Sequence, residues 1–148
     1  MSARTEFTML MALWLVAAAA LVAVLVPSWA DAKGEPISGC SATDGDTIRC
    51  GDERIRIIGI DAPELGSCRQ GRVCVEGDPV RATETIAGEL GKALTIERMG
   101  TDRYGRTLAH VYADGQSLAC TQMVAGSAEY VERWDDRPRG RVAAECGG

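Results

Sequence analysis

Beyond residue 35 the chain runs through short stretches in which apolar and polar residues alternate, a pattern typical of β-strands with one buried face. The pattern predicts five strands, over residues 36–43, 46–50, 53–60, 93–99 and 106–113. Helical spacing predicts helices over residues 79–90 and 117–125, and a short one near 141–146. Three strands, a helix, two strands and a helix predict an α+β, mainly β domain: a small antiparallel barrel with two or three packed helices.

The third expected strand carries an arginine into an otherwise apolar run. Residues 53–60 read ERIRIIGI, and strict alternation places Arg56 on the opposite face from Ile55 and Ile57. Gly59 interrupts the run and predicts a bulge or a bend near its end.

The first expected helix has clear boundary signals. Asp78 is positioned to cap it, Pro79 suits its first turn and Gly91 can end it. Helical spacing places four residues on one face: Val80, Thr83, Ala87 and Leu90.

The N-terminal segment has a different composition from the rest of the chain. Residues 9–26 are without exception apolar or small, and small residues follow at Ala30 and Ala32. This layout predicts a secretory signal cleaved after one of those alanines, or a retained membrane anchor through the apolar run. Either way we expect export to the periplasm or the extracellular space. The expected organisation is a signal or anchor at 1–30, a linker at 31–35 and one domain at 36–148.

Cysteine usage agrees with export. The six cysteines all lie beyond the apolar segment, and an even number in an exported chain predicts disulfides. Sequence neighbours suggest the bonds Cys40–Cys50, Cys68–Cys74 and Cys120–Cys146, one of the 15 connectivities that six cysteines allow. A zinc site is disfavoured, because no pair has C-x-x-C spacing and His110 is the only histidine.

The chain is acidic, with 16 Lys or Arg residues against 21 Asp or Glu residues and a formal net charge of −5. Non-specific affinity for nucleic acid comes mostly from neutralising phosphates. A nucleic-acid partner would therefore require a local concentration of positive charge or a bound metal ion.

Charge is concentrated at strand ends in three short segments, DGDT (44–47), RIIGIDAPE (56–64) and TDRYGR (101–106). Each segment alone is typical of a turn, but the three together indicate a shared site. Asp46 and Asp61 supply hard anionic oxygens, which suit calcium or magnesium better than zinc.

The same segments supply the other parts of a phosphodiesterase. Glu64 follows Asp61 by three residues, so it is close enough to act on a metal-bound or nearby water. Arg56 and Arg106 carry planar guanidinium groups, which match phosphate oxygens in two-point geometry and can neutralise charge on a phosphoryl group in transfer.

With these residues in view, the segments DGDTI, IRIIGIDAPE and TDRYGRTLAHVYADG resemble the staphylococcal nuclease (thermonuclease) family. The match in order and spacing extends from about Gly39 to Trp134. The resemblance implies a five-stranded OB-fold Greek-key barrel with packed helices, and calcium-dependent hydrolysis of DNA and RNA phosphodiesters by an endonuclease. A monomer is the default for such a small barrel.

The resemblance also assigns the metal ligands and the base. The family's calcium carboxylates fall on Asp46 and Asp61, and its carbonyl ligand falls on Ala62, where the founding members carry threonine. Because that contact is made by the backbone, we expect alanine to be tolerated. The base or water-orienting glutamate falls on Glu64.

The family's phosphate-binding arginines fall on Arg56 and Arg106. Its substrate-pocket aspartate and tyrosine match Asp102 and Tyr104, and Arg103 stands where a lysine is usual. We expect these five residues to bind the substrate around the scissile phosphate.

Two further aromatic residues, Tyr130 and Trp134, do not align with the family's pocket tyrosines, so each could stack on a base or pack in the core. Other functions also remain open. The domain could be a nucleic-acid-binding OB-fold module of the cell envelope without catalysis, or an exported domain that binds a protein or the envelope. The intact set of carboxylates and arginines favours the nuclease, because a binding module has no use for a metal beside a base.

Overall fold

In a computed structural model the described residues are 33–68, 71–135 and 140–147. The expected signal or anchor, with its apolar run at 9–26, lies outside them. Among the helices in these three ranges, none combines the length and the apolar character needed to span a membrane. The division of the N-terminal region into signal and linker therefore stays a prediction.

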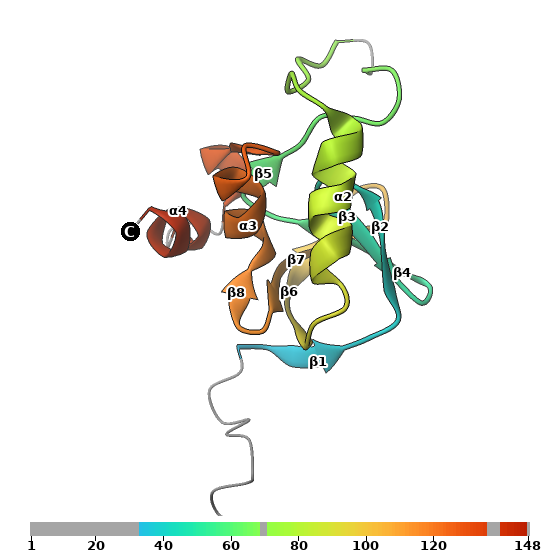
Figure 1. The fold of residues 1–148 in the computed structure, drawn as a ribbon, viewed down its shortest axis with the longest axis vertical. Helices are drawn as coiled ribbons and strands as arrows, with labels where there is room; N and C mark the ends of the chain where they lie inside the picture. The colour runs from blue at the N-terminus through green and yellow to red at the C-terminus, as the bar shows by residue number, and fades with distance from the viewer. Residues whose placement is uncertain (1–32, 69–70, 136–139, 148) are drawn as a thin grey trace, which may run out of the picture. The chain divides into compact units, whose positions relative to one another are not determined.

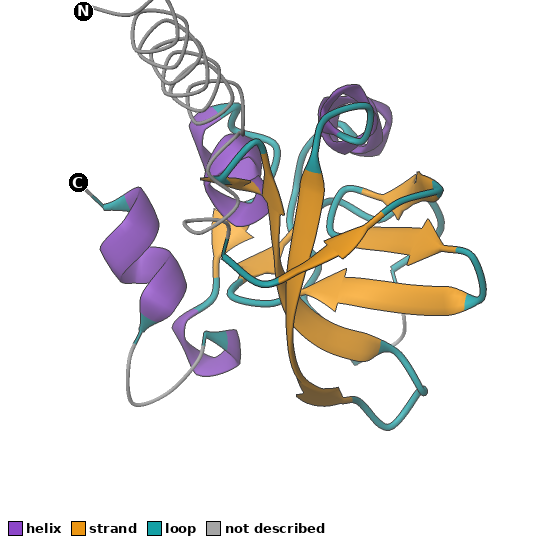
Figure 2. Ribbon diagram, turned by 90° about the horizontal axis from the view of Figure 1, so that it is seen from below, coloured by secondary structure: helices purple, strands orange, loops and turns teal. Residues whose placement is uncertain are grey.

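The sheet structure is mixed and strongly curved, and forms a half-barrel (Figure 2). Its main sheet has the order β1-β6-β7-β4-β3-β2, with β8 beside β7, and a second sheet pairs β5 with β9. All of these pairs are antiparallel except β4 with β7. The bounds are β1 Glu35–Ile37, β2 Cys40–Asp44, β3 Thr47–Cys50, β4 Glu53–Ile57, β5 Ile60–Asp61, β6 Leu94–Thr101, β7 Thr107–Ala113, β8 Gln116–Ser117 and β9 Glu129–Tyr130.

Glycines divide two of the five expected strands. The expected strand 36–43 becomes β1 and β2, separated at Gly39 (φ 67°), and the expected strand 53–60 becomes β4 and β5, separated at Gly59 (φ 80°). A Cβ at Gly59 would also come within 2.6 Å of Val142. The bend expected at this position is therefore confirmed. It turns the chain so that Asp61 reaches Arg56 of β4.

The helices are α2 (Pro79–Glu89), α3 (Leu118–Val124) and α4 (Arg141–Cys146), with a 3-10 turn, η2, at Glu132–Trp134. Figure 1 shows α2 running across the strands, with α3 beside it and α4 on the far side of α3. The expected cap is present, because Asp78 Oδ1 accepts hydrogen bonds from the amides of Val80 (2.9 Å) and Arg81 (3.1 Å).

The most buried face of α2 is not the one that carries Val80, Thr83, Ala87 and Leu90. Ala82 and Ile86 are fully buried, whereas Val80 is 55% exposed and Ala87 is exposed. The reason is that α2 packs against β2 and α3 through the face that carries Ala82 and Ile86. Side chains on its other faces, such as those of Val80 and Ala87, therefore point to solvent.

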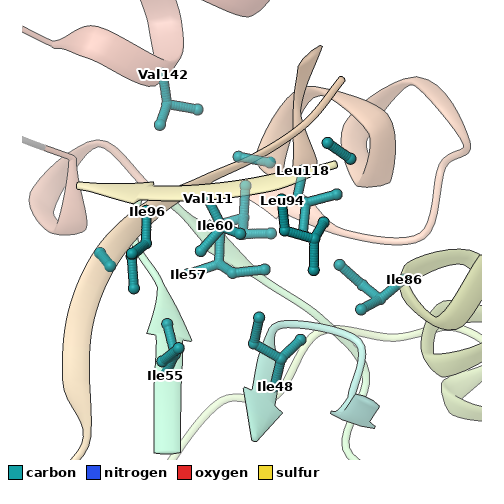
Figure 3. Close-up of a cluster of buried hydrophobic side chains, with 13 residues drawn as sticks. Ile48, Ile55, Ile57, Ile60, Ile86, Leu94, Ile96, Val111, Leu118 and Val142 are labelled. Atoms are coloured by element: carbon teal, nitrogen blue, oxygen red, sulfur yellow. The ribbon is translucent and has the colours of Figure 1, made fainter. Parts of the chain in front are cut away.

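The core is rich in isoleucine (Figure 3). Ile55 and Ile57 are buried as expected, but Arg56 between them is also only 7% exposed, so β4 is covered on both faces. Burying a guanidinium is costly unless opposite charges surround it. The largest buried apolar side chains are Ile48, Ile55, Ile57, Ile60, Ile86, Leu94, Ile96, Val111, Leu118 and Val142.

The structure contains the three expected disulfides. Cys40–Cys50 joins facing positions of β2 and β3, and Cys120–Cys146 joins α3 to α4. Cys68–Cys74 closes a loop between β5 and α2. This last bond matters most for the site, because Arg72, which lies between these two cysteines, contacts Asp61 and Glu64.

Candidate active site

A pocket lies where the end of β4, the loop after β5, the β6–β7 turn and η2 meet. Its charged lining consists of six arginines and four acidic residues, although the whole chain has a net charge of −5. The local concentration of positive charge that a nucleic-acid partner would require is therefore present. The arginines are Arg54, Arg56, Arg72, Arg103, Arg106 and Arg133, and the acids are Asp44, Glu64, Asp102 and Asp135.

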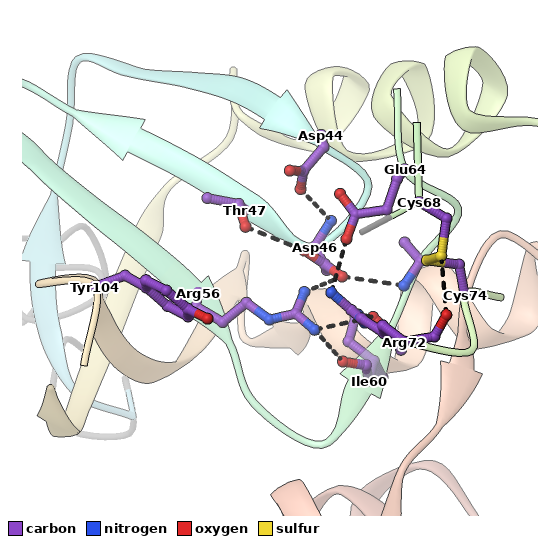
Figure 4. Close-up of polar contacts among 12 residues, drawn as sticks. Asp44, Asp46, Thr47, Arg56, Ile60, Glu64, Cys68, Arg72, Cys74 and Tyr104 are labelled. Carbon is purple, nitrogen blue, oxygen red and sulfur yellow. Dashed lines mark hydrogen bonds and ion pairs between the residues drawn. A yellow bond between two sulfur atoms is a disulfide. The ribbon is translucent and has the colours of Figure 1, made fainter. Parts of the chain in front are cut away.

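Arg56 lies between the two expected metal carboxylates (Figure 4). Its Nη2 donates to Asp61 Oδ1 (3.1 Å) and to the carbonyl of Ile60 (3.1 Å). Its Nη1 forms an ion pair with Asp46 Oδ2. Burial lowers the pKa of Arg56 from its ordinary value, and the charge of Asp61 opposes that shift. A guanidinium is not deprotonated in proteins, so the group stays a cation.

Asp46 is held in place from three directions. Its Oδ1 accepts from the hydroxyl of Thr47 (3.0 Å), and its Oδ2 accepts from the amide of Ala62 (3.0 Å) and contacts Arg56. Its backbone carbonyl accepts from the amide of Ile57 (2.9 Å). The residue therefore connects the β2–β3 turn to β4 and to the segment after β5.

The residues present fit a hard cation in their donor chemistry. Asp46 and Asp61 each place one carboxylate oxygen against the same positive group, the guanidinium of Arg56. Carboxylate and carbonyl oxygens are the ligands that calcium prefers. Within the described ranges, however, no group of three or more Asp, Glu, His or Cys side chains is arranged to hold a metal ion. Two carboxylates converge, and Glu64 does not join them.

Glu64 instead pairs with an arginine that the sequence analysis did not single out. Arg72 Nη1 donates to Glu64 Oε1 (2.8 Å), and its Nη2 donates to Asp61 Oδ1 (2.6 Å). The hydrogen bond to Asp61 raises the pKa of Arg72 further above its ordinary value. The only sequence signal was its place between Cys68 and Cys74, directly after the carboxylates.

The β6–β7 turn carries a second set of expected site residues. Asp102 Oδ1 accepts from the amides of Tyr104 (2.8 Å) and Arg106 (2.9 Å), and its Oδ2 accepts from Arg106 Nε (2.8 Å). Although burial opposes it, this donation by Arg106 and Tyr104 holds the pKa of Asp102 below its ordinary value. Tyr104 lies between two guanidinium groups, 4.8 Å from that of Arg103 and 5.6 Å from that of Arg106.

The two aromatic residues near η2 have different surroundings. Trp134 lines the pocket, and the guanidinium groups of Arg56, Arg72 and Arg133 lie 5.3, 5.7 and 4.8 Å from its ring. Tyr130 packs against the core, and its hydroxyl donates to Asp135 Oδ2 (3.0 Å). Trp134 therefore belongs to the site and Tyr130 to the scaffold.

His110 lies in β7, is 2% exposed and does not line the pocket. Its burial agrees with a structural role. The chain's one histidine thus takes no part in the candidate site.

Comparison with known proteins identifies the same family that the sequence motifs resemble. A family model described as "Staphylococcal nuclease homologue" matches residues 54–143, a range that holds Arg56, Glu64, Arg72 and Arg106 but begins after Asp46.

Among curated proteins, the micrococcal nuclease of Shigella flexneri is 38% identical over 109 residues, which cover 70% of this chain and 56% of that protein. Protein ParB of Escherichia coli is 35% identical over 116 residues, covering 75% of this chain and 57% of that protein. An uncharacterized endonuclease of Escherichia coli is 35% identical over 102 residues, covering 64% and 60%. The chain thus spans a little over half the length of these curated relatives.

Proposed function

The chain belongs to the staphylococcal nuclease family, and from this premise we propose that it is a calcium-dependent endonuclease that hydrolyses phosphodiester bonds of DNA or RNA. The observation that carries the proposal is a pocket lined by six arginines in an otherwise acidic chain. One of these arginines, Arg56, pairs with the buried carboxylates of Asp46 and Asp61. Such a pocket attracts a polyanion and also holds the acidic groups that hydrolysis needs. Two of the relatives are named as nucleases, which supports the proposal.

Arg56 and Arg106 bind the scissile phosphate in this proposal. Both line the pocket, and a guanidinium stabilises the charge that grows on the phosphoryl oxygens in the transition state. In the free protein Arg56 is held by Asp46 and Asp61. Arg106 is fixed by Asp102.

Glu64 acts as the general base or orients the attacking water. Its side chain is 38% exposed and lines the pocket, so water reaches it. A carboxylate within hydrogen-bond reach of the water takes its proton as the oxygen attacks phosphorus in line with the leaving oxygen. The proton passes to Glu64, and the displaced oxygen leaves from the opposite side.

Asp46, Asp61 and the carbonyl of Ala62 would hold the calcium ion, which supplies Lewis-acid polarisation of the phosphate when bound. Two carboxylates that converge on one cation support this assignment. Calcium takes about 6–8 oxygen ligands, so water and substrate would complete the shell.

Tyr104, Arg103 and Trp134 bind the nucleotides on either side of the scissile bond. Tyr104 and Trp134 line the pocket and can stack on bases, and Arg103 is placed to contact phosphate. Asp102 makes its three hydrogen bonds within its own turn. We therefore give Asp102 a positioning role for Arg106 rather than direct contact with substrate.

We further propose that the protein acts outside the cytoplasm, in the periplasm or beyond it. Three disulfides among the described residues support this, because such bonds persist in oxidising compartments.

Digestion assays test the proposed function. The purified full-length chain, disulfides intact, is incubated with single-stranded DNA and with RNA in calcium, in magnesium and in a calcium chelator. We expect cleavage in calcium and none in the chelator. Retention of intact nucleic acid in a gel-shift assay, without cleavage in either metal, would instead identify the non-catalytic binding module.

A further inference from the structure

Arg72 occupies the two carboxylates that the proposed reaction needs. One guanidinium nitrogen donates to Glu64 and the other to Asp61 (2.8 and 2.6 Å). Among the arginines that line the pocket, Arg72 thus contacts both the proposed base and one proposed metal ligand (Figure 4).

The surroundings of Arg72 differ from those of Arg56. The Arg72 side chain is 35% exposed, whereas that of Arg56, a residue of strand β4, is 9% exposed. Arg72 comes from the loop that Cys68–Cys74 closes over a sequence separation of six residues. A side chain that is partly exposed on a short closed loop can leave its partners, yet the loop keeps it near them.

Arg56 and Arg72 both donate to Asp61 Oδ1, at 3.1 and 2.6 Å. A metal ion bound between Asp46 and Asp61 would add a further positive charge beside that oxygen and would repel Arg72. The displaced guanidinium needs another anion within reach of its loop. A substrate phosphate in the pocket provides one, in the two-point geometry that arginine favours.

We propose that Arg72 is a further substrate-binding arginine, which rests on Asp61 and Glu64 in the free protein and transfers to a nucleic-acid phosphate when cation and substrate bind. This rests on the proposed function, since it takes the pocket to be the nucleic-acid site. It makes two predictions of opposite sign. Removing Arg72 strengthens cation binding to the free protein and weakens the binding of nucleic acid.

The test compares the wild-type chain with Arg72→Gln and with a matched control, Arg98→Gln. Arg98 also bridges two carboxylates, Glu53 and Glu35, and its side chain is 40% exposed, but it does not line the pocket. Calcium affinity of the free protein is measured by calorimetry. Affinity for phosphorothioate single-stranded DNA in calcium is measured by anisotropy over a salt series, with gel analysis to verify that the strand stays intact.

For Arg72→Gln we expect DNA affinity to fall on the order of tenfold, as for one lost hydrogen bond to a charged group. The slope of log affinity against log salt should become shallower by about 0.7, the value for one phosphate contact to a single strand. Calcium should bind the free variant more tightly than wild type. Arg98→Gln should change none of these quantities.

Two results would overturn the inference. Tighter calcium binding with unchanged DNA affinity and salt slope would make Arg72 a blocking group only. Unchanged binding of both ligands would make it a surface ion pair without a role. In either case wild-type cleavage in calcium would leave the proposed function standing. A wild-type chain that neither cleaves nor binds nucleic acid would remove the proposed function itself, and the inference with it.

Discussion

The guanidinium of Arg56 lies 3.1 Å from Asp61 Oδ1, and both side chains are less than a tenth exposed. A buried ion pair of this kind adds little net stability, but removal of one partner leaves the other charge buried and uncompensated. Arg56 also faces Asp46, so two carboxylates depend on one cation. The same arrangement therefore serves the fold and, in our proposal, the substrate.

Arg56→Met should destabilise the protein in a chelator by about 3–5 kcal/mol, the cost of breaking a buried pair. Added calcium should restore part of that loss, roughly 2.7 kcal/mol at 100 times its dissociation constant, because the ion can take the place of the guanidinium between the carboxylates. Urea unfolding with and without calcium measures both effects.

The control is Arg98→Met, whose ion pairs with Glu53 and Glu35 lie at the surface. It should change stability by about 1 kcal/mol or less and should not alter the response to calcium. If calcium stabilised Arg56→Met no more than wild type, the assignment of Asp46 and Asp61 as metal ligands would be wrong.

Much of the fold follows from local signals. Alternating segments predicted the strands of the main sheet, and Asp78 with Pro79 predicted the start of α2. The division of a strand at Gly39 did not follow from these signals. The buried face of α2 did not follow either, because a helix with small and apolar residues on several sides is oriented only by what it packs against.

The site was predictable to a similar extent. Asp46, Asp61 and Arg56 lie in strands or at strand ends, so their convergence follows from the sheet. Arg72 lies in an irregular loop, and its contacts depend on the path that the loop takes in three dimensions. A charged residue in such a loop gives no periodic signal.

Glu64→Gln should lower the cleavage rate by about 10²–10⁴-fold, the range for loss of a general base. Stability should change by about 0.5 kcal/mol or less, since the side chain is 38% exposed. Single-turnover kinetics and thermal unfolding measure the two quantities. Glu84→Gln, at an exposed position of α2, is the control. A variant at position 64 with the wild-type rate would exclude Glu64 as the base.

Asp102→Ala should act through Arg106. Loss of its hydrogen bonds frees the arginine and the turn, so kcat/KM should fall by about tenfold or more while stability falls by about 1 kcal/mol. The double variant Asp102→Ala/Arg106→Ala should be no slower than Arg106→Ala alone, because the two residues act as one unit. Additive losses in this cycle would show that Asp102 contacts substrate directly.

Glu53 makes the stability of the protein depend on acid pH. Arg98 donates two hydrogen bonds to its carboxylate (2.9 and 2.8 Å), and the hydroxyl of Thr107 donates a third (2.8 Å). Hydrogen bonding by Arg98 is the main reason that the pKa of Glu53 falls to about 2 from an ordinary 4.5. The folded protein therefore holds the charged form more strongly than the unfolded chain does.

A depressed pKa in the folded state means that this stabilisation is complete above about pH 4.5 and is lost as the pH falls through about 2. Glu53→Gln should thus lower the free energy of unfolding near pH 7 by about 1 kcal/mol, a modest value because the side chain is 30% exposed. The difference from wild type should shrink between pH 4.5 and 2 and vanish below that. Urea unfolding of both proteins at pH 7, 4.5, 3 and 2 measures it, and a difference that stayed constant over this range would show that the charge of Glu53 contributes nothing to folding.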